Sequence, residues 1–127
     1  MSESRSVAVI GASSDRRKYG NKAVRAYRDS GWRVFPVNPN EAVVEGLPAF
    51  PSVKAIGEPV HTVTLYVPAS VGVKLLPEIA AAKPEELWIN PGAGSVELLA
   101  EAKRLSLRTI EDCSIVALGR SPAEYPA

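Results

Sequence analysis

A loop of small residues followed by cations is the part of this sequence best suited to chemistry. An apolar run at residues 7–10 stops at a glycine, and the small residues that follow lead into the basic stretch 16–18. The loop consists of Gly11, Ala12, Ser13 and Ser14. Small side chains let a ligand approach the backbone, and oriented amides at the start of a helix favour a bound phosphate. We therefore expect this loop to hold a phosphate, with Lys18 or an adjacent arginine balancing its charge.

The residues after the next apolar run bear on which nucleotide is expected. The dinucleotide fingerprint requires a second glycine two residues after the first and a third three residues later, but Ser13 and Arg16 stand there. The second run ends in Asn38, Pro39 and Asn40, with no carboxylate for the NAD ribose and no arginine for the NADP phosphate. A small NAD(P)-dependent oxidoreductase therefore stays an alternative that lacks its two usual signals.

Apolar runs alternate with helical or loop segments along the chain, which is typical of a parallel sheet covered by helices. The runs lie at residues 7–10, 34–37, 63–67, 87–89 and 109–110. We predict an α/β fold with a single Rossmann-like, doubly wound domain, whose core spans about residues 5–116. Its five-stranded parallel sheet is expected in the order 3-2-1-4-5. The ligand is then expected at the carboxyl ends of the strands, at the switch between strands one and four.

The first connection is expected to be a helix and the second a loop. Residues 21–30 have helical spacing, with Asn21 or a nearby residue as the cap and Gly31 at the end. Residues 41–60 are rich in proline and glycine, so we predict a loop with one helical turn around residues 52–56.

Two later segments also have helical spacing. Residues 69–83 contain Pro77, which must kink this helix or start a new one. Residues 95–105 form a clearer amphipathic helix with Ser95 as its cap. Its predicted buried side comprises Val96, Leu98, Leu99, Ala102 and Leu105. The last residues, 117–127, are expected to form a surface tail.

Length and charge restrict the class of protein. The 127 residues suffice for one domain, and the 46% hydrophobic and 23% charged residues are ordinary for a globular protein. Residues 1–40 carry eight Lys/Arg against three Asp/Glu, whereas residues 41–127 carry seven against eleven. This asymmetry suits a small polyanion and is too modest to predict nucleic-acid binding. No run has the length of a membrane span and residues 1–6 lack a secretion signal, so we expect a cytoplasmic protein.

The sequence contains no recognisable catalytic set. His61 is the only histidine, and it precedes the third predicted strand, at the end away from the expected crevice. Cys113 is the only cysteine, which excludes an intramolecular disulfide and a Cys-based metal cluster. A buried or merely tolerated thiol is the more usual interpretation of Cys113, with a reactive thiol as the alternative. We therefore predict neither catalytic residues nor a metal site.

Four segments in order resemble the landmarks of a known family. They read GASSDRRKYGNKAV, VFPVNPN, EGLPAFPSV and LYVPAS. Together they are similar to stand-alone CoA-binding domain proteins, relatives of the N-terminal domain in the alpha subunit of succinyl-CoA synthetase. The likeness runs from about residue 5 to residue 116. It implies coenzyme A as the ligand, with its phosphates on the first loop and its pantetheine arm along the carboxyl edge of the sheet.

The resemblance also implies a role for individual positions. The phosphates would meet Gly11, Ala12, Ser13, Ser14 and Lys18, and the adenosine would pack near Val37, Asn38, Pro39 and Asn40. The opposite wall would be Val67, Pro68, Ala69 and Ser70, and the thiol end would lie near Asn90, Pro91, Gly92 and the residues up to 94. Many relatives carry a lysine shortly after the Asn-Pro turn, where this chain has Asn40 and Glu41.

We therefore expect a protein that binds CoA or an acyl-CoA without catalysis, as a sensor, a carrier or a module that regulates a partner. In succinyl-CoA synthetase the phosphorylated histidine belongs to a further domain, which is not expected in this chain. The alternatives are the NAD(P)-dependent oxidoreductase and an interaction protein whose nucleotide pocket is vestigial. An unidentified protein partner or a homodimer is compatible with each of them.

Overall fold

A parallel sheet of five strands forms the centre of the molecule. The computed structural model describes residues 5–127, so most of the segment inspected for a secretion signal lies outside the described residues. The sheet is entirely parallel and has the order β2-β1-β5-β6-β7. Its strands are β1 (Ser6–Ile10), β2 (Arg33–Val37), β5 (Thr62–Leu65), β6 (Glu86–Ile89) and β7 (Thr109–Glu111). The predicted α/β fold with a five-stranded parallel sheet is confirmed.

The predicted strand order was wrong. Counted along the chain, the five strands lie in the order 2-1-3-4-5 instead of 3-2-1-4-5. The outer edge of β2 is already taken by Phe50, which accepts a hydrogen bond from the Asn38 amide and donates one to the Pro36 carbonyl, both at 2.9 Å. The third strand, β5, therefore pairs with the other side of β1. Both orders are doubly wound, but the switch point now lies between β1 and β5.

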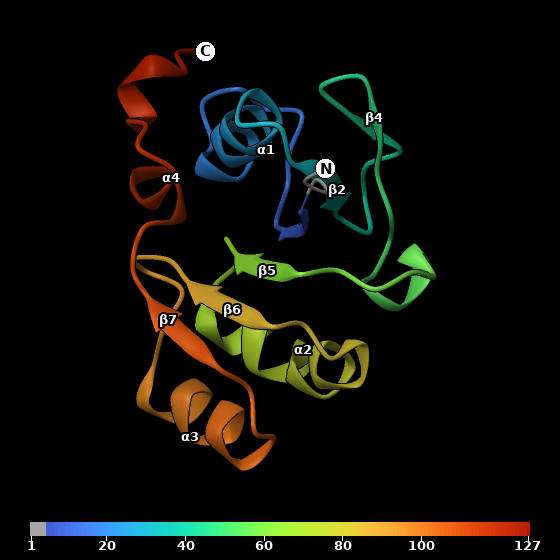
Figure 1. Cartoon of the computed structure of the whole chain (residues 1–127), viewed down its shortest axis with the longest axis vertical. Helices are drawn as coiled ribbons and strands as arrows, with labels where there is room; N and C mark the ends of the chain where they lie inside the picture. The colour runs from blue at the N-terminus through green and yellow to red at the C-terminus, as the bar shows by residue number, and fades with distance from the viewer. Residues whose placement is uncertain (1–4) are drawn as a thin grey trace.

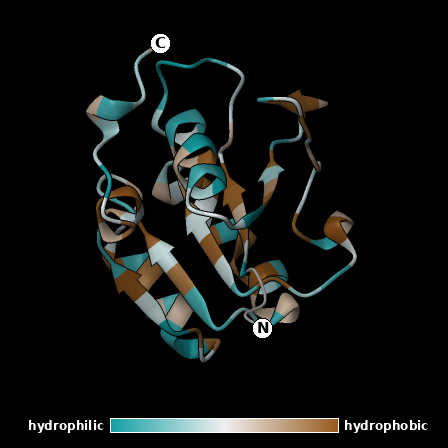
Figure 2. Cartoon of the chain, turned by 45° about the horizontal axis from the view of Figure 1, so that its top comes forward, coloured by the Kyte–Doolittle hydropathy of each residue, from teal (hydrophilic) through white to brown (hydrophobic). Residues whose placement is uncertain are grey.

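Helices cover both faces of the sheet (Figure 1). One face carries α1 (Tyr19–Asp29), α4 (Ser114–Ala117) and the 3₁₀ turn η2 (Pro122–Glu124). The other carries α2 (Ala69–Ala82), α3 (Val96–Arg104) and the 3₁₀ turn η1 (Lys54–Ile56). Side chains of β1 alternate between the two cores, Val7 and Val9 toward α1, Ala8 and Ile10 toward α2. Figure 2 shows the hydrophobic residues concentrated along the strands between these layers.

Helix α1 begins earlier than predicted. Lys18 is its N-cap residue and makes no side-chain capping bond, while Asn21 lies inside the helix and is fully buried. The predicted cap at Asn21 was therefore wrong, because its amide is used in tertiary contacts described below. The end of the helix agrees with the prediction, since Ser30 follows it and Gly31 adopts the left-handed conformation with φ of 85°.

Helices α2 and α3 agree with the predictions in part. Ser95 caps α3 as predicted, its Oγ accepting a bond from the Leu98 amide at 3.0 Å. Val96, predicted to be buried, is 87% exposed because it lies in the first turn and faces away from the sheet. Helix α2 continues through Pro77, so the alternative of a new helix at that proline was wrong.

Two connections contain structure that the sequence patterns did not reveal. Residues 41–60 hold the predicted helical turn η1 and also an antiparallel hairpin of β3 (Val43–Val44) and β4 (Leu47–Pro48). Glu45 and Gly46 form its turn with φ of 51° and 77°. The predicted surface tail is anchored, since Tyr125 is only 6% exposed and packs in the same core as α1.

Within residues 5–127, no helix combines the length and the apolar character needed to cross a bilayer.

Candidate functional site

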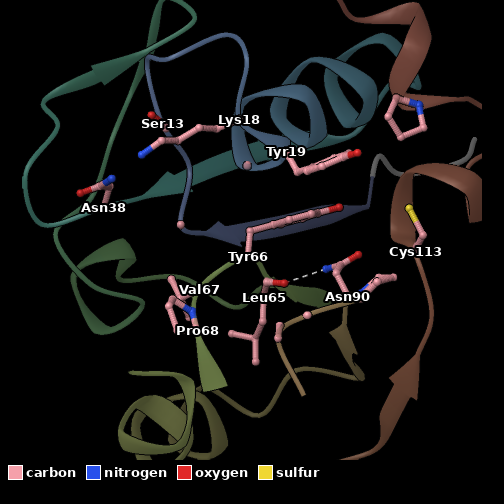
Figure 3. Close-up of a pocket in the computed structure, with 16 residues that line it drawn as sticks. Ser13, Lys18, Tyr19, Asn38, Leu65, Tyr66, Val67, Pro68, Asn90 and Cys113 are labelled. Atoms are coloured by element: carbon pink, nitrogen blue, oxygen red, sulfur yellow. Dashed lines mark hydrogen bonds between the residues drawn. The ribbon is translucent and has the colours of Figure 1, made fainter. Parts of the chain in front are cut away.

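A pocket of about 800 Å³ opens at the carboxyl ends of β1, β5 and β6 (Figure 3). This volume lies within the usual range for a small-molecule or cofactor site. Of the predicted site residues, the structure brings together Gly11, Ser13, Lys18, Asn38, Val67, Pro68, Asn90, Pro91 and Gly92. Ala93, within the predicted segment 90–94, also lines it. The wall is completed by residues that the sequence analysis did not assign to it: Tyr19, Gly20, Leu65, Tyr66, Cys113 and Pro122. The pocket stands at the switch point between β1 and β5, where a doubly wound sheet binds its ligand.

Two glycines allow the loop 11–18 to lie tightly between α1 and the sheet. Gly11 has a φ of 93°, and a Cβ there would come 2.5 Å from the carbonyl oxygen of Tyr66. A Cβ on Gly20 would overlap the carbonyl oxygen of Gly11. The start of α1 therefore rests directly on the loop backbone, which only glycine permits at this position. A glycine in the first turn after a loop of small residues is the signal that could have identified Gly20.

Side-chain amides hold the carbonyl oxygens of this loop. Asn38 Nδ2 donates to the Ala12 carbonyl and Asn21 Nδ2 donates to the Ser13 carbonyl, each at 2.8 Å. Asn38 thus lines the pocket but positions the loop with its side chain. Asn21 was predicted as a cap, and its bond to the loop was missed because the partner stands eight residues earlier, outside any capping pattern.

Several backbone amides of the pocket wall are left without an acceptor. Within the described part of the chain, the amides of Ser13, Tyr19 and Gly20 donate to no other residue. The last two belong to the first turn of α1, where the helix dipole adds partial positive charge. Free amides at the start of a helix can bind an anion, and the neighbouring Ala12 and Ser13 carbonyls already accept hydrogen bonds from side-chain amides.

Of the three cations that follow the loop, Lys18 is the one that lines the pocket without an ion pair among residues 5–127. Arg17 makes two bonds of 3.0 Å to Asp15, and its guanidinium holds the pKa of that carboxyl at about 2. Arg16 pairs with Glu45 at 3.3 Å. These local pairs reduce the effective positive charge of the stretch to that of Lys18.

Ser14 does not line the pocket itself but follows Ser13, which does, and the Glu41 carboxylate occupies its donors. Its amide and its hydroxyl both donate to Glu41 Oε2, at 2.7 and 2.9 Å. These two bonds, with a smaller contribution from the charge of Lys18, hold the pKa of Glu41 below its ordinary value. Ser14, one of the predicted phosphate ligands, is therefore already bound to a carboxylate of the protein.

The remaining predicted residues do not line the pocket. Ala12 and Val37 belong to the two hydrophobic cores, and Asn40 donates its amide to Asn38 Oδ1 at 2.8 Å. The predicted residues outside the pocket wall are Ala12, Ser14, Val37, Pro39, Asn40, Ala69 and Ser70. Most of them adjoin a residue that does line it, since they follow the same strand ends.

Asn90 is at the pocket wall, but its side chain is occupied inside the protein. Nδ2 donates to Thr64 Oγ1 at 2.7 Å and to the Leu65 carbonyl at 2.8 Å, and Oδ1 accepts from the amide and hydroxyl of Ser114. The Tyr66 hydroxyl extends this network to Ser114 at 2.9 Å, and burial raises the pKa of Tyr66. This closed network ties together the ends of β5 and β6 and the start of α4.

The only histidine and the only cysteine lie in different places. His61 precedes β5 at the amino edge of the sheet, with Thr62 Oγ1 at 2.7 Å from Nδ1 and Glu85 at 3.5 Å from Nε2. Its predicted position away from the pocket is confirmed. Cys113 is half-buried in the pocket wall, at the end opposite Asn38 (Figure 3). In the described residues, no three His, Cys, Asp or Glu side chains are grouped to hold a metal ion.

With this geometry, the comparison with known proteins identifies the family. The family model described as "CoA binding domain" matches residues 5–119. The chain belongs to the CoA-binding domain family. The resemblance drawn from the four sequence segments is thus confirmed, and the match covers the loop 11–18 and the strand ends that surround the pocket.

Relatives of this CoA-binding domain occur within large ligases. The acetate–CoA ligase (ADP-forming) I of Archaeoglobus fulgidus is 34% identical over 105 residues, which are 83% of this chain and 15% of the ligase. The alpha subunit of acetate–CoA ligase (ADP-forming) II of Pyrococcus furiosus is 40% identical over 65 residues, 50% of this chain and 14% of the subunit. The chain therefore spans only a small part of these relatives.

Two solved structures resemble this chain, one along nearly the whole of its own length and one over a quarter of its own length. A conserved hypothetical protein from Pyrococcus furiosus superposes with a TM-score of 0.83 at 32% identity, covering 89% of this chain and 98% of that one. A dinucleotide-forming acetyl-coenzyme A synthetase from Ca. Korarchaeum cryptofilum gives 0.74 at 25% identity, covering 84% of this chain and 25% of the synthetase. The fold of this chain thus makes up nearly all of one solved protein and a quarter of a much larger enzyme.

Proposed function

We propose that this protein binds coenzyme A or an acyl-CoA in the pocket at the carboxyl edge of the sheet and catalyses no reaction on it. The observation that carries the proposal is the anion-binding end of the pocket, where the amides of Ser13, Tyr19 and Gly20 and the amine of Lys18 are available. The family match supports CoA as the anion's source.

The shape of the pocket suggests an orientation for the ligand. The diphosphate would lie against Ser13 and Lys18, and the adenosine would lie between Asn38 and Pro68. The pantetheine arm would then run past Tyr66 toward Cys113, at the far end of the pocket (Figure 3). Backbone groups of the turn 90–94 would face the thiol, since the Asn90 side chain is occupied internally.

A binding role without catalysis is supported by the positions of the reactive groups. His61 lies at the opposite edge of the sheet, and Cys113 has no histidine beside it to act as a base. We propose that the protein presents or senses CoA, and that any chemistry on the bound thioester belongs to a separate protein or domain. This proposal draws on the relatives, in which the domain is part of larger ligases.

The test is a calorimetric titration of the nucleotide-stripped protein with CoA, acetyl-CoA, NAD and NADP. We expect binding of CoA or acetyl-CoA only. Lys18→Ala should weaken that binding about tenfold, as expected for loss of one charge-assisted phosphate contact. Ser13→Asp should abolish it by placing a carboxylate at the free amides.

Lys74→Ala is the matched control, because Lys74 is an exposed lysine on α2 outside the pocket wall. Its affinity for CoA should equal that of the unaltered protein. A preference for NAD or NADP would favour the oxidoreductase alternative, and no binding of any of the four compounds would favour an interaction protein. Equal affinity in all three variants would refute the assignment of the phosphate site.

A further inference from the structure

We infer that Glu41 is an affinity-determining residue beside this pocket: its carboxylate occupies the Ser14 donors at the edge of the phosphate loop, and a ligand phosphate must compete with it for them. This inference rests on the proposed binding of a phosphate-bearing ligand. It concerns how strongly the site binds that ligand.

The contact has the geometry of a bound anion. Two donors of one residue, the Ser14 amide and the Ser14 hydroxyl, converge on a single oxygen of Glu41 at 2.7 and 2.9 Å. Charged acceptors form short, strong bonds of this kind, and a phosphate oxygen would require the same two donors. Glu41 therefore satisfies the loop as a phosphate oxygen would.

The contact is tertiary. Glu41 stands 27 residues after Ser14 and reaches it from the turn that follows β2. That turn also supplies Asn38, whose amide holds the Ala12 carbonyl at 2.8 Å. The turn thus positions the loop with one side chain and occupies one of its anion donors with another.

The charge of Glu41 acts in the same direction as its hydrogen bonds. Lys18 is the charged group that acts on the Glu41 carboxylate, and it is also the pocket's available cation. A carboxylate near Lys18 offsets part of its attraction for an incoming phosphate. Neutralising Glu41 should therefore make the two Ser14 donors more available and also remove the negative charge that offsets Lys18.

The test compares Glu41→Gln with the unaltered protein in titrations with CoA and, separately, with inorganic pyrophosphate, following the Ser14 amide by ¹⁵N NMR. Glutamine keeps the size of the side chain and removes the charge. We expect about tenfold tighter binding of both compounds, since bonds to a neutral acceptor are weaker than bonds to a carboxylate. Glu101→Gln, which breaks the exposed pair with Arg104 on α3, is the matched control and should change neither affinity.

A double-mutant cycle separates occupation of Ser14 from a general charge effect. In a Ser14→Ala background the gain from Glu41→Gln should shrink to about threefold or less, because one of the two contested donors is gone. Unchanged or weaker binding in Glu41→Gln, or the same gain with and without the Ser14 hydroxyl, would overturn the inference. Tighter binding of pyrophosphate without any binding of CoA would support the inference on Glu41 and refute CoA as the ligand.

Discussion

The loop 11–18 and the turn 90–94 both follow a strand at the carboxyl edge of the sheet and both line the pocket, but their polar groups have opposite availability. In the loop, the carbonyls of Ala12 and Ser13 are bound by asparagine side chains, and amides of the wall are left open. In the turn, Asn90 uses both ends of its amide inside the protein.

A polar residue at a strand end is therefore not by itself a ligand-binding group. What matters is which donors and acceptors the rest of the protein leaves unsatisfied. The loop can bind an anion because its carbonyl oxygens accept hydrogen bonds from asparagine side chains, while amides of the pocket wall stay free. The Asn90 side chain of the turn is not available to a ligand, because its hydrogen bonds join β5, β6 and the start of α4. Substitutions in the loop and in the turn should therefore differ in their effects on binding and on stability.

Gly20→Ala should disrupt the open region most strongly. The added methyl would overlap the Gly11 carbonyl oxygen, and this backbone contact has no flexible side chain that could yield. We expect a loss of roughly 3 kcal/mol or more in the free energy of unfolding, measured in urea, together with loss of CoA binding. Gly94→Ala is the control, because its Cβ would meet only a side-chain methyl group of Ile89, at 3.1 Å, and no backbone atom within 4 Å. Equal losses in the two variants would contradict the close packing of α1 on the loop.

Asn90→Ala should show that the turn is structural. The substitution leaves the buried Ser114 amide and the Leu65 carbonyl without their partner, so about 2–3 kcal/mol of stability should be lost. Lys18→Ala should do the reverse and keep the unfolding free energy within about 0.5 kcal/mol while weakening CoA binding. The comparison fails if Lys18→Ala is the more destabilising of the two in chemical denaturation.

Arg25→Met tests the support behind the loop. Arg25 is 5% exposed and donates to the carbonyls of Arg16, Tyr125 and Pro126 at 2.9–3.0 Å. Methionine retains the apolar stem but none of these bonds, so we expect a loss of about 2 kcal/mol. Hydrogen exchange should show faster exchange in residues 121–126 than in α3. Unchanged protection of that segment would contradict the anchoring role.

The smallest effect concerns acid stability. The hydrogen bond from Asn21, with the nearby Arg16, lowers the pKa of Glu45 in the folded protein. Its contribution to stability is therefore full above the unfolded pKa of about 4.3 and disappears as the pH falls through the lower folded value. Glu45→Gln should reduce the stability difference between pH 7 and pH 3 by less than about 1 kcal/mol. An unchanged difference in thermal unfolding at the two pH values would contradict this role.

Local signals made much of the site predictable. The glycine after the first strand, the cation Lys18 and the turns after the second and third strands can each be recognised from a few neighbouring residues, and the structure brings all of them to one pocket. The close contact of Gly20 with the loop and the bond from Asn21 to it were not predicted, because both depend on what the folded chain places against these residues. The strand order was wrong for the same reason, since Phe50 competes for the edge of β2 only in the folded sheet.

Local sequence patterns were sufficient for the alternation of strands and helices, for the family, and for short-range hydrogen bonds such as the one from the Leu98 amide to Ser95. The tertiary structure decided which polar groups are free. Contacts such as Glu41 with Ser14, Asn90 with Ser114, and Arg25 with Tyr125 join residues 24 to 100 positions apart. Composition and periodicity report only short-range order, whereas these pairings exist once packing has placed distant segments together.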